Sequence, residues 1–466
     1  MTVATASAGT AAPEAPPRPG AGAPRPYHFP DFERRALPNG LRLVVAPVHR
    51  LPLVSVVVVV DAGAASDPAG REGLAVLTAR ALVEGTASMD AVALVERVEG
   101  LGSALDSGAD WDAAVVSLTA LAPKLGDAFE VLADVLVRPA FPAREVDRLK
   151  GERLAELLHL RSEPRGLAEE ALARAVYADG SRYARPEAGG EASVAALTEA
   201  DVRAFHAARY HPAATTVIVA GDVTADAAEA LVARTLGTWD GPAAPAPAPA
   251  DAPASTTRRV HLVPKADAAQ SEVRLGHVGV RRDTPDYFPL LVMNSILGGL
   301  FNSRVNMNLR ERHGYTYGAR SGFDWRRAAG PFTVESAVAS DVTVAAAKEM
   351  LIEIDRIREE PVGADELSLA TSYLDGVFPI RYETTAAIAS ALASAVVYGL
   401  PDDYFDAYRE RVRGVTADDV RRVAREHLRP DALQLLVVGD AAAVQGPLEA
   451  FAFGPIVVHD VDAVVR

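Results

Sequence analysis

The histidines are the first residues to test for metal chemistry, because the sequence has no cysteine and zinc in proteins is bound chiefly by cysteine, histidine and carboxylates. The chain has 10 histidines, and no two of them lie three or four positions apart. Two ligands on one helix face need that spacing, so the sequence contains no helical two-histidine metal site. His206 and His211 come nearest, but a spacing of five places them on different helix faces, and we interpret them as surface or packing residues.

Other self-sufficient catalytic motifs are missing as well. The segment "GLGSAL" (100–105) lacks the third glycine of a dinucleotide-binding loop and follows a helical pattern rather than a strand, so it is interpreted as a helix-ending turn. The sequence contains neither a Walker-type lysine loop nor the G-x-S-x-G pattern of serine hydrolases. These residues therefore indicate no complete catalytic site within this chain.

Composition excludes several classes of partner. The formal net charge is −15 and the pI is about 5.2, whereas nucleic-acid binding needs a basic surface, so no nucleic-acid partner is expected. The longest apolar run, "LPLVSVVVVV" (51–60), is too short to span a bilayer and rich in β-branched residues, so it predicts a buried strand and no membrane association. The first residues resemble no signal peptide, which predicts a cytoplasmic protein.

The sequence divides into two related halves. The segments 197–222 and 415–440 align without a gap at an offset of 218, from a helix-capping threonine to a closing Gly-Asp. Between them lies an alternating Ala/Pro stretch that is typical of an extended linker. We therefore predict a disordered Ala/Pro/Gly tail, an N-terminal half, a linker and a C-terminal half at residues 1–28, 29–240, 241–257 and 258–466.

The elements that these patterns predict are clustered by type. An Asn-Gly turn in "LPNGLRLVVAPV" (37–48) predicts a hairpin, and helical periodicity follows near 89–102, 125–137, 142–163 and 164–178. The second half repeats the outline, with strands near 259–280 and helices near 286–297, 343–358, 363–375 and 383–398. The expected fold class is α+β, with two duplicated halves that each form a mostly antiparallel sheet with helices packed on one face.

The order of the hairpin, "DPAGREGLAVLTARALVEGT", "RLAELLHLRSEP" and "GGLFNSRVNMNLRERHGYTYGARSGF" resembles the pitrilysin-like inverzincin peptidases, which include the mitochondrial processing peptidases. In active members of that family this helix carries H-x-x-E-H, with a glutamate roughly 75 residues later as the third zinc ligand. The resemblance places Val76, Ala79 and Arg80 at the motif positions and Glu156 at the distant ligand. It therefore implies a degenerate motif and no metal bound by this chain.

Arg80 would place a fixed positive charge where the metal sits in such relatives. We expect Leu74, Leu77, Ala81 and Leu82 to keep the packing face of the helix. Arg80 is predicted to pair with Glu84 or with Glu156. The alternative for Glu156 is a solvated helix residue.

The C-terminal half retains a second feature of that family. Similar proteins carry an arginine and, seven residues later, a tyrosine, which bind the substrate backbone over the zinc site; Arg310 and Tyr317 match in type and spacing. A guanidinium and a phenol can both stabilise an oxyanion. Gly314 is expected to end the preceding helix, with Tyr315 and Tyr317 on one face of the next strand. The alternative is that Arg310 is a helix-end cation and Tyr317 a strand aromatic.

A turn before this pair also matches the family. "LGGLFNSR" (297–304) resembles its Gly-Gly-x-x-x-S-R turn, which places Gly298, Gly299, Ser303 and Arg304 near the peptide. The long glycine-rich loop of the processing peptidase's noncatalytic subunit is not present, so that subunit's mode of substrate capture is not implied.

The resemblance implies a zinc-less subunit of a two-subunit peptidase. A homologous partner bearing H-x-x-E-H would hold the zinc, and this chain would bind peptide substrate and supply Arg310 and Tyr317 in trans. The alternative is a catalytically silent scaffold or a peptide-binding assembly protein of the same fold. A third reading, an independent hydrolase with an unrecognised site, has no residue pattern to support it.

Overall fold

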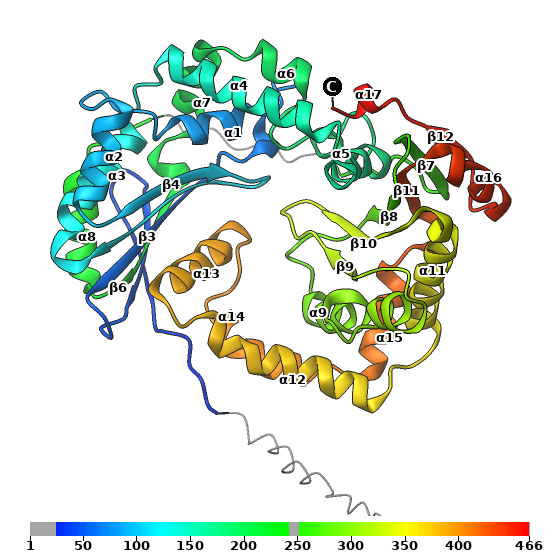
Figure 1. Cartoon of the computed structure of the whole chain (residues 1–466). Coiled ribbons are helices and arrows are strands. Elements are labelled where there is room, and N and C mark those ends of the chain that lie inside the picture. The colour runs from blue at the N-terminus through cyan, green and yellow to red at the C-terminus, as the bar shows by residue number, and fades with distance from the viewer. Residues whose placement is uncertain (1–24, 242–250, 466) are drawn as a thin grey trace, which may run out of the picture.

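The computed structural model describes residues 25–241 and 251–465. Most of the predicted tail and the centre of the predicted linker, residues 1–24 and 242–250, lie outside the described residues. The two halves of the chain form two sheets with their own helices (Figure 1). The predicted fold class, α+β with two similar halves, is confirmed.

The first half is built on a six-stranded sheet with the order β1-β2-β6-β3-β5-β4. Its strands are β1 (Glu33–Ala36), β2 (Arg42–Pro47), β3 (Leu53–Val60), β4 (Ala104–Ala109), β5 (Ala114–Leu121) and β6 (Thr215–Gly221). Only β2 and β6 pair in parallel. β1 and β2 form the predicted hairpin, whose turn needs Gly40 at a φ of 88°. The β-branched run in β3 is buried on both faces, as in a strand covered on both sides.

The second half repeats this sheet with the order β12-β7-β11-β8-β10-β9. Its strands are β7 (Arg259–Pro264), β8 (Gln270–Val278), β9 (Ala319–Phe323), β10 (Pro331–Ala339), β11 (Gln434–Gly439) and β12 (Ile456–Val458). β7 pairs in parallel with β11 and β12, and the other pairs are antiparallel. β4 and β9 hold the equivalent edge position in the two sheets.

Both halves also contain helices. The first half contains α1 (Leu74–Ala81), α2 (Ala91–Gly100), α3 (Leu125–Val137), α4 (Ala143–Leu160), α5 (Pro164–Val176), α6 (Glu191–Ala196), α7 (Glu199–Arg209) and α8 (Ala225–Leu236). The second half contains α9 (Tyr287–Asn294), α10 (Arg304–Asn306), α11 (Thr343–Glu359), α12 (Ala364–Arg381), α13 (Thr385–Val397), α14 (Tyr404–Arg413), α15 (Ala417–His427), α16 (Ala441–Phe451) and α17 (Val461–Val465). Two π-helical turns, η5 (Ser295–Gly299) and η6 (Met307–Arg312), flank α10. Within the described ranges, no helix is long and apolar enough to cross a membrane.

The duplicated segment folds the same way in both halves. Thr198 starts α7 and Thr416 starts α15, each with a capping box that uses an aspartate three residues later. Each helix is followed by a short turn and then by a buried strand, β6 in one half and β11 in the other. The alignment of the two segments therefore predicted a real structural repeat.

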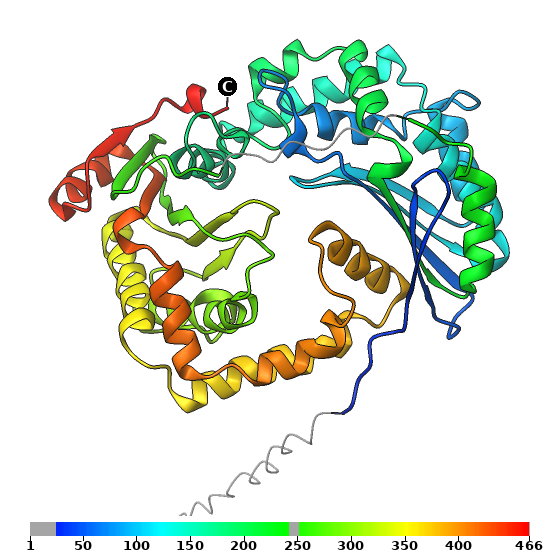
Figure 2. The ribbon, with the colours of Figure 1, turned by 180° about the vertical axis from the view of Figure 1, so that it is seen from behind.

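Each half also covers the far face of the other half's sheet with one helix, which the sequence did not predict. α13 packs on β3 and β6, and the hydroxyl of Thr385 lies 2.8 Å from that of Ser55. α5 packs on β8 and β11, and Arg274 of β8 lies 3.4 Å from Glu169 of α5. Figures 1 and 2 show both helices reaching across from their own half. This exchange buries both faces of each sheet and fixes the two halves to each other.

The turn between β9 and β10 adds a second connection between the halves. The backbone N–H of Arg327 donates to the carboxylate of Asp112 at 3.0 Å. The guanidinium of Arg326 lies 4.4 Å from the ring of Trp111 and 4.5 Å from that of Tyr183, within cation–π range. Burial raises the pKa of Asp112 to about 6. The turn therefore clasps the first half through one buried carboxylate and one stacked arginine.

Candidate functional site

The start of α1, the helix with the degenerate motif, is fixed by Asp67. The Asp67 carboxylate accepts hydrogen bonds from the backbone N–H groups of Gly73 and Ala75, at 2.7 and 2.8 Å, which satisfies free donors at the helix start. Arg182 donates to the same carboxylate at 2.9 Å. Gly73 has a φ of 95°, and a Cβ there would lie 2.5 Å from the carbonyl oxygen of Ala188. The helix is therefore held firmly in place although it carries no histidine.

The motif positions on α1 offer no metal ligand. The packing face is buried as predicted, and it consists of Leu74, Leu77, Ala81 and Leu82. Ala79 is fully buried, whereas Val76 and Arg80 are half-buried. The carbonyl oxygen of Ala79 accepts a hydrogen bond of 2.7 Å from the hydroxyl of Ser107 on the edge strand β4. α1 therefore lies beside this edge strand but carries no side chain at the motif positions that could bind a metal.

Two carboxylates of α4 hold Arg80. Its Nη2 donates to Glu152 at 2.9 Å, and its Nη1 lies 3.8 Å from Glu156. The expected pair with Glu156 is therefore the longer of two contacts, and Glu152 is a partner that the sequence reasoning missed. The alternative pair with Glu84 is wrong, because Glu84 lies 2.6 Å from Arg148.

The donor set around α1 does not fit a catalytic zinc ion. Such an ion needs three protein ligands, and among the predicted positions only Glu156 has a ligand atom. Its carboxylate already lies within 3.4 Å of Arg153 and within 3.8 Å of Arg80. Because a guanidinium cannot be deprotonated in proteins, Arg80 opposes a cation at this place.

One other group of potential metal ligands occurs in the described part of the chain. The ligand atoms of Asp286, Glu426 and His427 lie within 4.8 Å of one another. Arg422 pairs with both acids, at 2.8 and 3.0 Å, and so supplies the positive charge that a metal would bring. We interpret the group as an ion-pair network that joins α9 to α15.

Arg310 and Tyr317 lie together before the edge strand β9. The Nη1 group of Arg310 donates to the main-chain carbonyl oxygen of Tyr317 at 3.1 Å, and its Nε lies 3.2 Å from Glu311. The guanidinium also lies 4.8 Å from the centroid of the Phe301 ring. The Tyr317 side chain is 91% exposed. The arrangement presents a phenol and part of a guanidinium to the surroundings.

The segment between these two residues differs in part from the expectation. Gly314 ends the helix as predicted, with a φ of 65° and an N–H that donates to the carbonyl oxygen of Arg310 at 3.1 Å. The expected strand at Tyr315 and Tyr317 is wrong, because β9 begins at Ala319. Tyr315 is half-buried whereas Tyr317 is exposed. Tyr317 therefore extends from a loop rather than from a strand, and its neighbours Thr316 and Gly318 are hydrogen-bonded to β10.

The predicted turn (297–304) packs against β9, the strand that follows this loop. A Cβ on Gly298 would lie 2.3 Å from the backbone nitrogen of Ser321 in β9, so glycine is needed for η5 to touch the strand. Gly299 is less constrained, with a Cβ contact of 3.0 Å. Ser303 is buried, and Arg304 binds both carboxylate oxygens of Glu366 at 2.8 and 2.7 Å.

Asn306 is a supporting residue that the sequence reasoning missed. Its side-chain amide donates to the carbonyl oxygen of Phe301 at 2.6 Å, and its side-chain oxygen accepts from the N–H of Ala319 at 3.0 Å. The buried amide thus ties the loop under Arg310 to the start of β9. No sequence motif predicts this role, because it depends on two backbone groups, of Phe301 and Ala319, that are separated in the sequence and meet only in the fold.

A cavity of about 440 Å³ with charged residues in its lining opens beside Tyr317. Its lining includes Glu272, Glu335, Arg320 and Arg165. Glu335 pairs with Arg320 and lies 3.2 Å from Arg274, and burial raises the pKa of Glu272. The two predicted groups of site residues, around Arg80 and around Arg310, are not joined by any ion pair or hydrogen bond of the described residues.

Comparison with known proteins identifies the fold family. Residues 44–186 match the family described as Insulinase (Peptidase family M16), and residues 196–374 match the Peptidase M16 inactive domain. The chain belongs to peptidase family M16. An uncharacterized zinc protease of Streptomyces coelicolor is 25% identical over 400 residues, which cover 85% of this chain and 87% of that protein.

Two solved structures share the fold of this chain. A crystal structure described as a peptidase M16 inactive domain from Pseudomonas fluorescens has a TM-score of 0.82 and 27% identity, and covers 88% of this chain and 98% of that chain. A protease from Helicobacter pylori shares the fold, with a TM-score of 0.81 and 18% identity over 88% of this chain and 99% of that chain. The inactive-domain matches and the missing histidines on α1 indicate a non-catalytic member of the M16 family.

Proposed function

We propose that this chain is the non-catalytic subunit of a two-subunit zinc peptidase. A homologous partner with H-x-x-E-H would hold the zinc and the water-activating glutamate, whereas this chain binds peptide substrate and contributes Arg310 and Tyr317 to the partner's active site. The observation that carries the proposal is the exposed Tyr317 side chain beside a braced Arg310. A tyrosine that is 91% exposed contributes almost nothing to this chain's own core.

The chemistry of the pair suits a developing negative charge. Nη1 and Nε of Arg310 are engaged within the chain, which leaves Nη2 as a charged donor directed by two fixed contacts. The phenol of Tyr317 supplies one further donor. Two preorganised donors are the usual requirement for stabilising an oxyanion, and neither group needs a metal in its own chain.

The N-terminal half of the chain also supports the proposal that the partner holds the zinc and this chain binds the peptide. Arg80, held by Glu152 and Glu156, places positive charge and no zinc ligand at the motif helix. The free edge of β4 lies beside that helix and could add an extended peptide as a further strand. This chain is therefore suited to holding a peptide and unsuited to hydrolysing it alone.

The test is hydrolysis of a quenched fluorescent peptide by this chain, by a candidate homologue with H-x-x-E-H, and by their mixture. We expect activity that appears or rises strongly only in the mixture, is lost on chelation, and is lowered by Arg310→Ala. Arg312→Ala, two residues away on the same turn, is the matched control. Chelator-sensitive hydrolysis by this chain alone, or a mixture no faster than the homologue, would contradict the proposal.

A silent scaffold is the second candidate, and one observation favours it. Arg310 makes three contacts inside its own chain, with Tyr317, Glu311 and Phe301, which is also how a purely structural brace would look. A brace predicts that Arg310→Ala lowers the melting temperature while Tyr317→Phe changes neither stability nor turnover. The two candidates therefore differ on Tyr317→Phe in the active mixture.

A further inference from the structure

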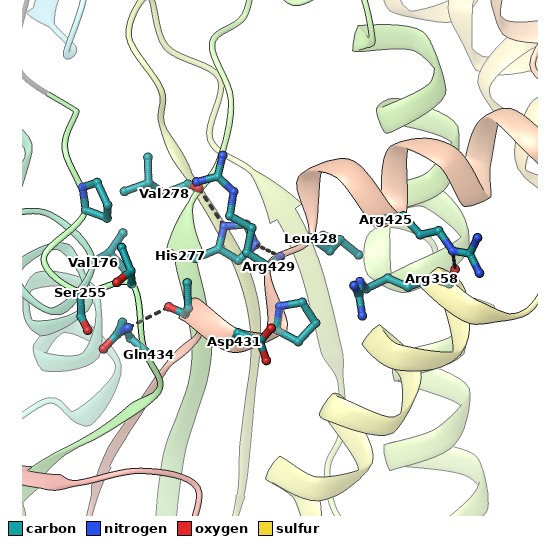
Figure 3. Close-up of a pocket in the computed structure, with 14 residues that line it drawn as sticks. Val176, Ser255, His277, Val278, Arg358, Arg425, Leu428, Arg429, Asp431 and Gln434 are labelled. Carbon is teal, nitrogen blue, oxygen red and sulfur yellow. Dashed lines mark hydrogen bonds between the residues drawn. The ribbon is translucent and has the colours of Figure 1, made fainter.

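A second cavity is lined by residues of both halves and shares no lining residue with the cavity beside Tyr317. It measures about 350 Å³ and is shown in Figure 3. Its walls come from the end of α5, from residues 253–256 before β7, from β8, and from the ends of α11 and α15. It therefore lies where the two halves and the segment between them meet.

The charges that line this cavity are unbalanced. Three arginines, Arg358, Arg425 and Arg429, face a single carboxylate, Asp431. The chain as a whole carries a net charge of −15, so this excess of positive charge is local to the cavity. Arginines that line one cavity repel one another, and a bound anion relieves that repulsion.

The three arginines are not equally engaged. Arg425 is committed, because its Nε donates to the carbonyl oxygen of Arg358 at 2.9 Å and its Nη2 lies 3.2 Å from Glu359. Arg358 has only long contacts, at 3.7 Å to Asp355 and 3.9 Å to Glu359, and both use Nη1. Its guanidinium extends from α11 toward Leu428 and Asp431 in Figure 3.

Arg429 is the most available of the three. Its side chain is exposed and makes no ion pair or hydrogen bond with the described residues. Its backbone, in contrast, is fixed, because its N–H donates to Nε2 of His277 at 3.2 Å. His277 donates from Nδ1 to the carbonyl oxygen of Val278 at 2.8 Å, and burial lowers the pKa of His277 to about 4. His277 is therefore a neutral support that holds Arg429 in place and adds no charge.

The rest of the wall is mixed. Its apolar part consists of Val176, Pro253, Val278, Leu428 and Pro430, and its uncharged polar part includes Ser255, Thr256 and Gln434. Arg425 of α15 caps the end of α11 through the carbonyl oxygen of Arg358. No such capping contact accounts for Arg429, which lies beyond the end of α15. A volume of about 350 Å³ lies within the range of small-molecule sites.

We propose that this cavity binds a small organic anion, with its carboxylate or phosphate group between Arg358 and Arg429 and its apolar body against Leu428 and Val176. Guanidinium groups recognise both kinds of oxyanion through paired hydrogen bonds. Because Val176 belongs to the first half and Arg429 to the second, the bound anion joins the two halves. The site is independent of the proposed role in peptide hydrolysis.

The test is binding of phenyl phosphate and benzoate to the purified full chain, measured by calorimetry at constant ionic strength. Inorganic phosphate and benzyl alcohol report the anionic and the apolar part separately. We expect saturable one-to-one binding of phenyl phosphate or benzoate, with each probe at least tenfold tighter than benzyl alcohol. A preference between the two probes identifies the oxyanion.

Arg429→Gln is the decisive variant, because its side chain is exposed and makes no contact that folding would need. We expect it to weaken binding at least tenfold, and the double change Arg358→Gln with Arg429→Gln to weaken it further. Arg144→Gln, on α4 with a side chain that is 94% exposed, is the matched control and should bind like the wild type. Equal affinity in Arg429→Gln and the wild type, or no saturable binding of either probe, overturns the proposal.

Discussion

Arg310 contacts Tyr317 through the backbone of the tyrosine, with 3.1 Å between Nη1 and the carbonyl oxygen, and leaves its phenol free. Substitutions at these two positions should therefore differ in their effects on the stability of the chain and on the turnover of the mixture. We expect Tyr317→Phe to leave the melting temperature unchanged, because the lost hydroxyl is solvated. We expect the same change to lower kcat of the mixture with its zinc-bearing partner by about 10²- to 10³-fold, as for loss of one oxyanion donor.

Arg310→Ala should affect both quantities. It removes the brace to Tyr317 and the contact with the Phe301 ring, so we expect a lower melting temperature as well as lower kcat. Thermal unfolding of the single chain and initial rates of the mixture measure the two effects. A Tyr317→Phe chain with unchanged kcat would leave the scaffold as the better account.

The second prediction concerns metal binding by α1, the helix with the degenerate motif. Val76→His together with Arg80→His would place two imidazoles four residues apart on α1 and remove the cation that now faces Glu156. We expect this double variant to bind one zinc ion per chain, while the wild type retains none after dialysis. Ala79 stays unchanged, so no hydrolysis is expected from the variant alone.

In that double variant, substitutions of Glu156 and Glu152 show which of the two carboxylates is the third zinc ligand. Glu156→Gln should weaken zinc binding at least tenfold, and Glu152→Gln, one helical turn away, should have a much smaller effect. Zinc titration with a colorimetric chelator measures both. Stoichiometric zinc in the wild-type chain, or none in the double variant, would show that these positions do not correspond to a zinc motif.

The sequence predicted the local elements well and the relations between distant elements poorly. Thr198 and Thr416 predicted the starts of α7 and α15, because a capping threonine and the aspartate that completes its capping box lie within one helical turn. The exchange of α5 and α13 between the sheets was not predictable, since hydrophobic periodicity shows that a helix packs but not on which sheet.

The candidate site shows the same limit. Spacing identified Arg310 and Tyr317 as a pair and Gly298 as a turn residue, and the structure brings Arg310 and Tyr317 into contact. Spacing could not show that Glu152 is the closer partner of Arg80, because Glu152 and Glu156 lie one helical turn apart and side-chain direction decides between them. Asn306 was missed because its partners are backbone groups, which carry no sequence signal.

Gly298 provides a third prediction, on stability. An added Cβ at Gly298 would lie 2.3 Å from the nitrogen of Ser321, so η5 and β9 would have to move apart. We expect Gly298→Ala to lower the free energy of unfolding by about 1–3 kcal/mol. Gly322→Ala, in β9 itself, is the matched control, because a Cβ there meets nothing within 4 Å. Urea unfolding of both variants decides the point, and equal stability would contradict it.

Asp112 provides a prediction about pH. Burial raises its pKa from the ordinary 3.8 to about 6, so the folded chain binds this proton more tightly than the unfolded chain does. The stabilisation from protonation is fully present below about pH 4 and is lost as the pH rises through 6. At pH 7.5 the buried, ionised carboxylate destabilises the contact between the β9–β10 turn and the first half.

Asp112→Asn removes that charge and keeps a side-chain oxygen that can accept the N–H of Arg327. We expect the variant to exceed the wild type in free energy of unfolding at pH 7.5 by about 1–3 kcal/mol, and the difference to shrink as the pH falls from 7.5 to 5. Asp106→Asn, at an exposed position of β4, should show no such change in the difference. If Asp112→Asn is instead less stable at pH 7.5, attraction between the carboxylate and Arg326 or Arg327 outweighs the cost of burying its charge.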